Sequence, residues 1–94
     1  MAFKDIGDPT AVTRAVDEFD AIGRGQFLKK YGFGPARRYF LLRDGRRYDS
    51  KAIVGAAHGY EHGRPLSSAD FSGGEATVMT LLESLGFEVV VDPR

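Results

Sequence analysis

The sequence predicts an α+β fold in which a small antiparallel sheet of about three strands packs with about four helices, in the order α-α-β-β-α-α-β. Apolar residues recur at helical steps in separate segments, strand-forming residues flank an Asp-Gly turn, and an apolar run lies near the end of the sequence. The chain has 94 residues and contains no repeat, linker or low-complexity segment. We therefore expect residues 1–94 to form a single domain.

Two helices are expected before the first strand. Asp8 can cap the first helix with its side chain, and Pro9 suits the first helical position because its missing N–H has no partner there. Gly23 ends this helix, whose apolar stripe consists of Val12, Ala15, Val16, Phe19 and Ile22. A shorter helix over residues 25–31 is expected to end at Gly32 in the left-handed conformation that glycine favours.

Residues 39–48 predict a β-hairpin. The segment from Tyr39 to Arg43 is rich in strand formers, Asp44-Gly45 suits a two-residue turn, and Arg46 to Tyr48 returns. Because side chains alternate along a strand, Arg46 and Tyr48 are expected on one face and Arg47 on the other.

A helix follows the hairpin, and either Asp49 or Ser50 can cap it. Gly55 inside this helix costs about 1 kcal/mol relative to Ala, which predicts that a neighbouring element crosses closely there. We expect the helix to end near Gly59, where Gly59 and Gly63 let the chain turn. Its apolar positions are Ala52, Ile53, Ala56, Ala57 and Tyr60.

The last helix is expected after a polar loop over residues 64–73. Ser72 and Glu75 have the spacing of a capping box, in which each side chain accepts from the backbone N–H of the other residue. Gly86 ends the helix, and an apolar strand over residues 87–91 can join the hairpin. The apolar stripe of this helix consists of Val78, Leu81, Leu82 and Leu85.

The composition excludes several classes of protein. Without cysteine, the chain can form no disulfide, thiolate nucleophile or Cys-containing zinc site. No segment approaches the roughly 20 apolar residues of a membrane-spanning helix, and the first residues lack a secretory pattern. We expect a cytoplasmic, nucleoid-associated protein without a cofactor.

The charge is unevenly distributed although the formal net charge is zero. Residues 24–64 contain ten Lys or Arg and three acids, whereas residues 1–23 sum to −3 and residues 65–94 to −4. Tyr39, Tyr48 and Tyr60 lie among the positive residues. Phosphate-binding cations together with aromatic faces are typical of nucleic-acid-binding proteins, while an ordinary solvated face is the alternative.

The hairpin and the helix after it contain the most informative candidate residues. The N–H groups at the helix start, the Ser50 hydroxyl and the Lys51 ammonium could together hold a phosphate, although a capped helix with a solvated lysine is the alternative. Arg37 and Arg38, directly before the first strand, could contact phosphates or a guanine. Ser72 and Gly73 lie at a second helix start, where the structural capping box is favoured over a DNA contact.

Metal binding and catalysis are weaker interpretations. His58 and His62 are four residues apart, but a helix that ends near Gly59 would point their rings differently, and no third Cys or His completes a zinc site. Asp44, Asp49 and Lys51 raise the alternative of a metal-dependent nuclease. Their spacing across a turn and a strand-to-helix junction suits a shared metal poorly.

Three blocks of sequence, taken together, resemble the N-terminal domain of McrA-type, modification-dependent HNH restriction endonucleases of actinobacteria. The blocks are Phe27-Leu28-x-x-Tyr31-Gly32-Phe33-Gly34-x-Ala36-Arg37, Asp44-Gly45-Arg46-x-Tyr48-Asp49-Ser50-Lys51-Ala52-Ile53, and Phe71-Ser72-Gly73-Gly74-x-x-Thr77 followed by Leu85-Gly86-Phe87. The resemblance covers about residues 25–91. It implies a DNA-recognition module for 5-methylcytosine in duplex DNA, with cleavage assigned to a separate HNH domain that this chain lacks. The possible contact residues that it carries over are Arg37, Arg46, Tyr48, Ser50, Lys51, Ser72, Gly73 and Thr77.

The sequence and the resemblance together predict a non-catalytic module that binds modified duplex DNA through a basic surface with aromatic residues. Tyr48 is the first candidate for an apolar wall against the methyl group, and Arg38, Tyr39 and Arg47 complete the expected contacts. If the base is flipped out, an aromatic sandwich would stack on it instead, formed from among Phe33, Tyr39, Tyr48, Tyr60 and Phe71. The alternatives are a non-specific DNA- or RNA-binding domain and a small metal-dependent nuclease.

Overall fold

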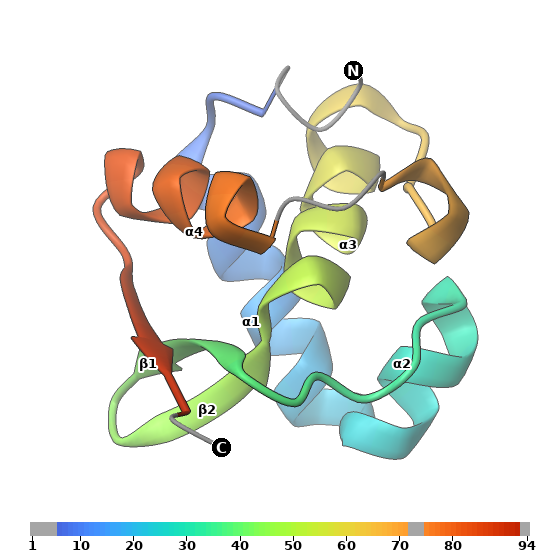
Figure 1. Cartoon of the computed structure of the whole chain (residues 1–94). Helices are drawn as coiled ribbons and strands as arrows, with labels where there is room; N and C mark the ends of the chain where they lie inside the picture. Colours follow the sequence, from blue (N-terminus) through green and yellow to red (C-terminus); the bar gives the residue numbers. More distant parts are fainter. Residues whose placement is uncertain (1–5, 72–74, 93–94) are drawn as a thin grey trace.

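The structure, a computed structural model, describes residues 6–71 and 75–92 and shows the predicted α+β fold (Figure 1). The small sheet lies at one side of the molecule, at the lower left of Figure 1, the helices occupy the rest, and α3 passes through the middle. The predicted order of helices and strands is confirmed, with one additional 3-10 turn, η2. The elements are α1 (Pro9–Ile22), α2 (Arg24–Tyr31), β1 (Tyr39–Arg43), β2 (Arg46–Asp49), α3 (Ser50–His62), η2 (Ser68–Asp70), α4 (Glu75–Ser84) and β3 (Glu88–Val91).

The sheet has the antiparallel order β2-β1-β3. Leu41, at the centre of β1, lies opposite Tyr48 on one side and Val89 on the other, and all three side chains are buried. Asp44 and Gly45 both have positive φ, at 53° and 79°. This is the backbone conformation of a tight hairpin turn whose twist matches that of the strands, so the Asp-Gly prediction is confirmed.

The helix ends follow the sequence signals. The Asp8 side chain accepts a hydrogen bond from the Thr10 N–H at 2.9 Å, and Gly32 adopts the left-handed conformation after α2. Helix α3 instead continues through Gly59 to His62 and ends at the left-handed Gly63. The turn expected at Gly63 is confirmed. The expected end near Gly59 is wrong, because this glycine lies inside the helix, where Pro65 packs closely against it.

The core forms around α3, which packs against α1, α4 and the sheet. Gly55 is a point of close approach within it. A Cβ atom added there would lie 2.5 Å from the carbonyl oxygen of Leu66 and 2.8 Å from the ring of Phe33. The predicted close crossing at Gly55 is thus confirmed, and the loop after α3 is the element that crosses.

The proposed capping box at Ser72 lies outside the described residues. A capping box that was not expected occurs at η2, between Ser67 and Asp70. In the described part of the chain, no helix combines the length and apolar character needed to cross a bilayer.

Candidate nucleic-acid interface

A buried carboxylate fixes the chain immediately before the first strand. Asp49 is 2% exposed, and its oxygens accept hydrogen bonds from Arg24 Nε and Nη2, both at 2.8 Å, and from the Ala36 N–H at 2.7 Å. The hydrogen bonds to Asp49 raise the pKa of the Arg24 guanidinium, which remains fully charged. A buried charge needs such partners. Because Ala36 directly precedes Arg37 and Arg38, its hydrogen bond to Asp49 fixes the backbone from which both arginines extend.

Three cations border a surface hollow of about 350 Å³ beside this carboxylate. We call Arg37, Arg38 and Lys51 the basic rim. Arg37 and Arg38 are exposed, and Lys51 is half-buried in the first turn of α3. The rest of the hollow is lined by Phe33, Gly34, Pro35, Ala36 and Ser68.

The basic rim has no ion-pair partner within 4.0 Å among residues 6–71 and 75–92. Arg38 lies 6.0 Å from the ring of Tyr39, which is half-buried, and its carbonyl accepts a hydrogen bond from the Asp92 N–H. These guanidinium and ammonium groups remain available to an anionic ligand.

Two predicted contact residues lie inside the protein. Tyr48 is 3% exposed, its ring meets Phe19 edge-on with centroids 4.9 Å apart, and its hydroxyl donates to Asp20. Ser50 is also 3% exposed, and its hydroxyl donates to the carbonyl of Tyr39 at 3.0 Å. The expectation that Tyr48 forms a wall against a methyl group is therefore corrected, and Ser50 does not offer its hydroxyl to a phosphate.

The hairpin arginines are exposed but paired. Arg46 Nη1 lies 3.2 Å from Asp20 Oδ1, and Arg47 Nη1 lies 3.8 Å from Asp92 Oδ2. Arg46 and Tyr48 share Asp20, which agrees with their expected placement on one face of β2. Exposed ion pairs of this kind are weak, so a phosphate can replace the carboxylate at small cost.

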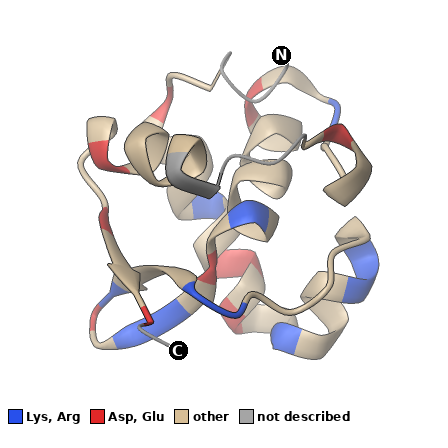
Figure 2. Ribbon diagram, in the orientation of Figure 1, with Lys and Arg blue, Asp and Glu red and all other residues tan. Residues whose placement is uncertain are grey.

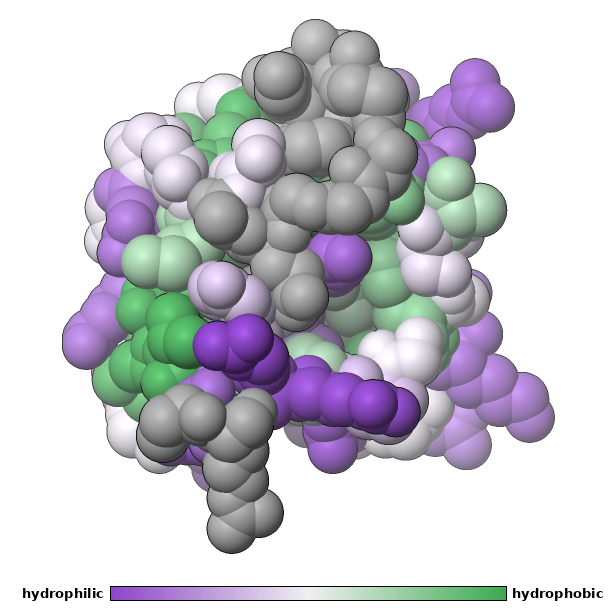
Figure 3. Space-filling view, viewed as in Figure 1, coloured by the Kyte–Doolittle hydropathy of each residue, from purple (hydrophilic) through white to green (hydrophobic). Residues whose placement is uncertain are grey.

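Of the predicted contact residues at the second helix start, Thr77 is among the described residues. Thr77 is exposed on α4 and does not line the hollow, while Ser72 and Gly73 lie outside the described residues. Lys and Arg segments occur mainly around the hairpin, the connection before β1, the start of α3, and α2 (Figure 2). On the same face, a strongly hydrophilic band crosses the lower part of the surface beside an apolar patch (Figure 3).

Comparisons with a family model and with a solved structure show the family of this chain. The family model described as the ScoMcrA-like N-terminal head domain matches residues 4–91. The chain belongs to this family. A solved structure, titled as that of the type IV phosphorothioation-dependent restriction endonuclease ScoMcrA, is 31% identical to the chain with a TM-score of 0.68. The match covers 93% of this head domain but 13% of that protein, and no curated protein matches the chain. The resemblance to McrA-type endonucleases is thus confirmed.

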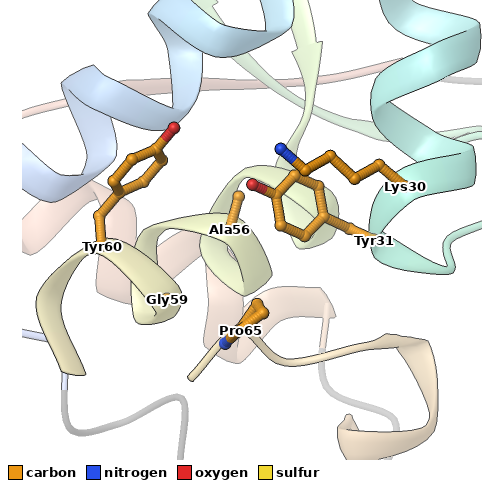
Figure 4. A pocket seen from close by; sticks show the side chains of 6 residues that line it. All are labelled: Lys30, Tyr31, Ala56, Gly59, Tyr60 and Pro65. Atoms are coloured by element: carbon orange, nitrogen blue, oxygen red, sulfur yellow. The ribbon is translucent and has the colours of Figure 1, made fainter. Parts of the chain in front are cut away.

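A second polar cluster of the head domain lies away from the basic rim. Glu18 accepts hydrogen bonds from the Tyr31 and Tyr60 hydroxyls and pairs with Lys30. Lys30, Tyr31 and Tyr60 also line a hollow of about 250 Å³ with Ala56, Gly59 and Pro65, and Figure 4 shows the two tyrosine rings on either side of Ala56. Because Glu18 already neutralises Lys30, this hollow offers less free positive charge than the basic rim.

The head domain does not bring metal ligands together in its described part. The ring centroids of His58 and His62 are 4.8 Å apart, because α3 continues past Gly59 and keeps both residues on one helix. However, His58 Nδ1 is already hydrogen-bonded to the carbonyl of Arg64. Asp44 lies in the turn before β2, whereas Asp49 is the last residue of β2 and pairs with Arg24. The sequence offered no local signal for the ion pair between Arg24 and Asp49, because the two residues are 25 positions apart.

Proposed function

We propose that this head domain binds duplex DNA through the basic rim and the exposed arginines of the hairpin. The observation that carries the proposal is the group of cations without carboxylate partners around one hollow, at a position held by Asp49. Cations that already have a carboxylate partner must exchange it, whereas the rim can contact phosphates directly. Such contacts supply most of the affinity and fix the register on the duplex.

We further propose that the domain helps to recognise modified DNA, with 5-methylcytosine as the first candidate because of the resemblance to McrA-type enzymes. A methyl group on a base needs an apolar wall close to cations that hold the backbone. Since Tyr48 is buried, Phe33 takes that role in the proposal: its ring lines the hollow beside Arg37, Arg38 and Lys51.

Phosphorothioated DNA is the second candidate, because the related ScoMcrA is described as phosphorothioation-dependent. A sulfur atom in place of a phosphate oxygen is softer and less strongly hydrated. A site that combines cations with apolar surface suits such a group, and the hollow has Pro35 and Ala36 next to Arg37.

In this proposal the domain is not itself an enzyme, and cleavage belongs to a separate HNH domain in longer relatives. The partner is therefore double-stranded DNA in the cytoplasm, at the nucleoid. Non-specific binding of DNA or RNA is the competing function.

Titration of labelled duplexes of one sequence tests the proposal. Unmodified, 5-methylcytosine-containing and phosphorothioated duplexes, together with an RNA duplex, are compared at two salt concentrations. We expect salt-dependent binding that weakens in Lys51→Ala and in the double variant Arg37→Ala/Arg38→Ala, but not in Lys29→Ala, which removes an exposed cation outside the hollow. Tighter binding of one modified duplex identifies the modification. Equal affinity for all duplexes overturns modification recognition, and the absence of salt-dependent binding overturns the DNA interface.

A further inference from the structure

We infer that the hollow inside the basic rim accepts the base of an extrahelical nucleotide, a conclusion that rests on the proposed DNA binding. The sequence left groove contact and base flipping open. The structure favours the second, because Phe33 lines the same recess as the free cations and lies on the connection before β1, not on a protruding strand or helix.

Phe33 is held rigidly enough to act as a stacking surface. Its ring packs against Gly55, where an added Cβ would lie 2.8 Å from Cζ, and meets Phe71 edge-on with centroids 5.7 Å apart. Its backbone N–H donates to the carbonyl of Leu28 at 2.9 Å. The ring remains half-exposed and lines the hollow. A fixed aromatic face with one accessible side is what a single unstacked base requires.

The size and chemistry of the hollow agree with this ligand. Its volume of about 350 Å³ is at the lower end for small-molecule sites, which suits one base better than an extended ligand. Pro35 and Ala36 provide apolar surface, and Ser68 brings a hydroxyl for the polar edge of the base.

The cations lie where the backbone of such a nucleotide would need them. A base inserted into the hollow leaves its two flanking phosphates at the mouth. Arg37 and Arg38 come from the connection before β1, and Lys51 comes from α3, so the rim approaches the hollow from two different elements. A site for phosphate alone would need these cations but not the aromatic wall.

Three otherwise identical duplexes test the inference: one fully paired, one with a single unpaired nucleotide, and one with an abasic residue at the unpaired position. For the unpaired nucleotide, the protein does not have to break a base pair before the base can leave the stack. We expect it to bind between about fivefold and a hundredfold tighter than the paired duplex, the range that one aromatic–base stack produces. The abasic duplex should lose that advantage.

Variants locate the base within the hollow. Phe33→Leu keeps apolar volume but removes the aromatic face, so it should abolish the preference for the unpaired nucleotide, while Phe33→Tyr should keep it. Tyr60→Leu, at an exposed aromatic residue outside this hollow, is the matched control and should leave the preference unchanged.

The possible outcomes separate the two proposals. Binding of the paired duplex with no advantage for the unpaired nucleotide, or an equal advantage for the abasic duplex, overturns the inference and leaves DNA binding intact. Failure to bind any of the three duplexes overturns the proposed function itself. The comparison among the duplexes uses the unaltered protein, so it decides the question even if Phe33→Leu does not fold.

Discussion

Tyr48 and Asp49 are adjacent in the chain, and both have roles that only distant partners determine. Tyr48 donates to Asp20 of α1, and Asp49 accepts from Arg24 at the start of α2. The sequence predicts Tyr48 at the end of a strand and Asp49 as a candidate helix cap, but it gives no sign that each has a partner more than 20 positions away. The expected alternation along β2 is correct, but the side chain of Tyr48 is buried against Phe19 and Asp20 of α1 and is not exposed.

Replacing Tyr48 by Phe separates its structural role from a role in binding. The change keeps the ring against Phe19 but removes the hydroxyl that lies 2.9 Å and 3.0 Å from the two Asp20 oxygens. We expect the free energy of unfolding to fall by about 1 kcal/mol, because one hydrogen bond to a partly exposed carboxylate is lost. DNA affinity should stay within about twofold, since the ring does not reach the surface. Denaturant unfolding and duplex titration measure the two effects, and a tenfold loss of affinity in a folded variant would contradict the correction.

Glu18 gives the stability a dependence on pH. Burial by itself raises the pKa of Glu18, but hydrogen bonds from Lys30, Tyr31 and Tyr60 outweigh burial and bring the pKa below its ordinary value of 4.5. A carboxyl whose folded pKa is lowered stabilises the fold above its unfolded pKa and loses that contribution as the pH falls through the folded pKa. We therefore expect part of the stability to disappear below about pH 4.5.

Unfolding curves at several pH values check this expectation. The variant Glu18→Gln should show a smaller difference in unfolding free energy between neutral pH and pH values below 4.5. Asp17→Asn, at an exposed acid on the same helix, serves as the control. An unchanged pH dependence in Glu18→Gln would exclude this carboxyl as its source.

At the level of elements, local sequence signals were sufficient for most of the architecture. Asp8, Gly32 and the Asp44-Gly45 turn all act where their conformational preferences indicate. The end of α3 was misplaced because tertiary packing overrides the intrinsic preference of glycine: Gly59 is kept helical and faces Pro65. The hollow could not be predicted, since it forms only where the connection 33–38 meets α3 and η2.

Gly55→Ala tests the crossing of α3 with the loop that follows it. Alanine gains up to about 1 kcal/mol of helix propensity, but its Cβ would lie 2.5 Å from a backbone oxygen that cannot easily move. We expect a net loss of stability of about 1–3 kcal/mol from overpacking. Thermal and denaturant unfolding measure it.

The matched control is Gly25→Ala in α2, where an added Cβ meets nothing within 4 Å. This variant should gain up to about 1 kcal/mol. A gain at position 55 equal to that at position 25 would show that the close contact costs nothing.

For the whole molecule, the sequence indicated a local excess of positive charge, but not which of the cations would pair with carboxylates in the folded protein. Of the ten cations in residues 24–64, Arg24, Lys30, Arg43, Arg46 and Arg47 lie within 4.0 Å of a carboxylate. The expected single basic surface is thus smaller than the charge count suggests, and the basic rim is a part of it in which three cations border one hollow.

The difference between paired and unpaired cations predicts how substitutions change the salt dependence of DNA binding. Each cation that contacts a phosphate contributes about 0.9 to the slope of log affinity against log salt concentration. The double variant Arg37→Ala/Arg38→Ala should therefore reduce the slope by about 2, and Arg47→Ala by less than 1, because Arg47 already faces Asp92. Titrations at four salt concentrations give the slopes. Equal reductions per residue in both variants would show that the ion pair has no influence.

The order β2-β1-β3 also has a consequence for how the molecule forms. The central strand β1 obtains one partner from the adjacent hairpin and the other from β3, whose first residue, Glu88, lies opposite Leu42, 46 positions earlier. During synthesis on the ribosome, the hairpin can therefore close early, but one side of β1 keeps unsatisfied backbone groups until residues 88–91 emerge. Nascent chains halted before β3 should be more prone to self-association than chains that include it.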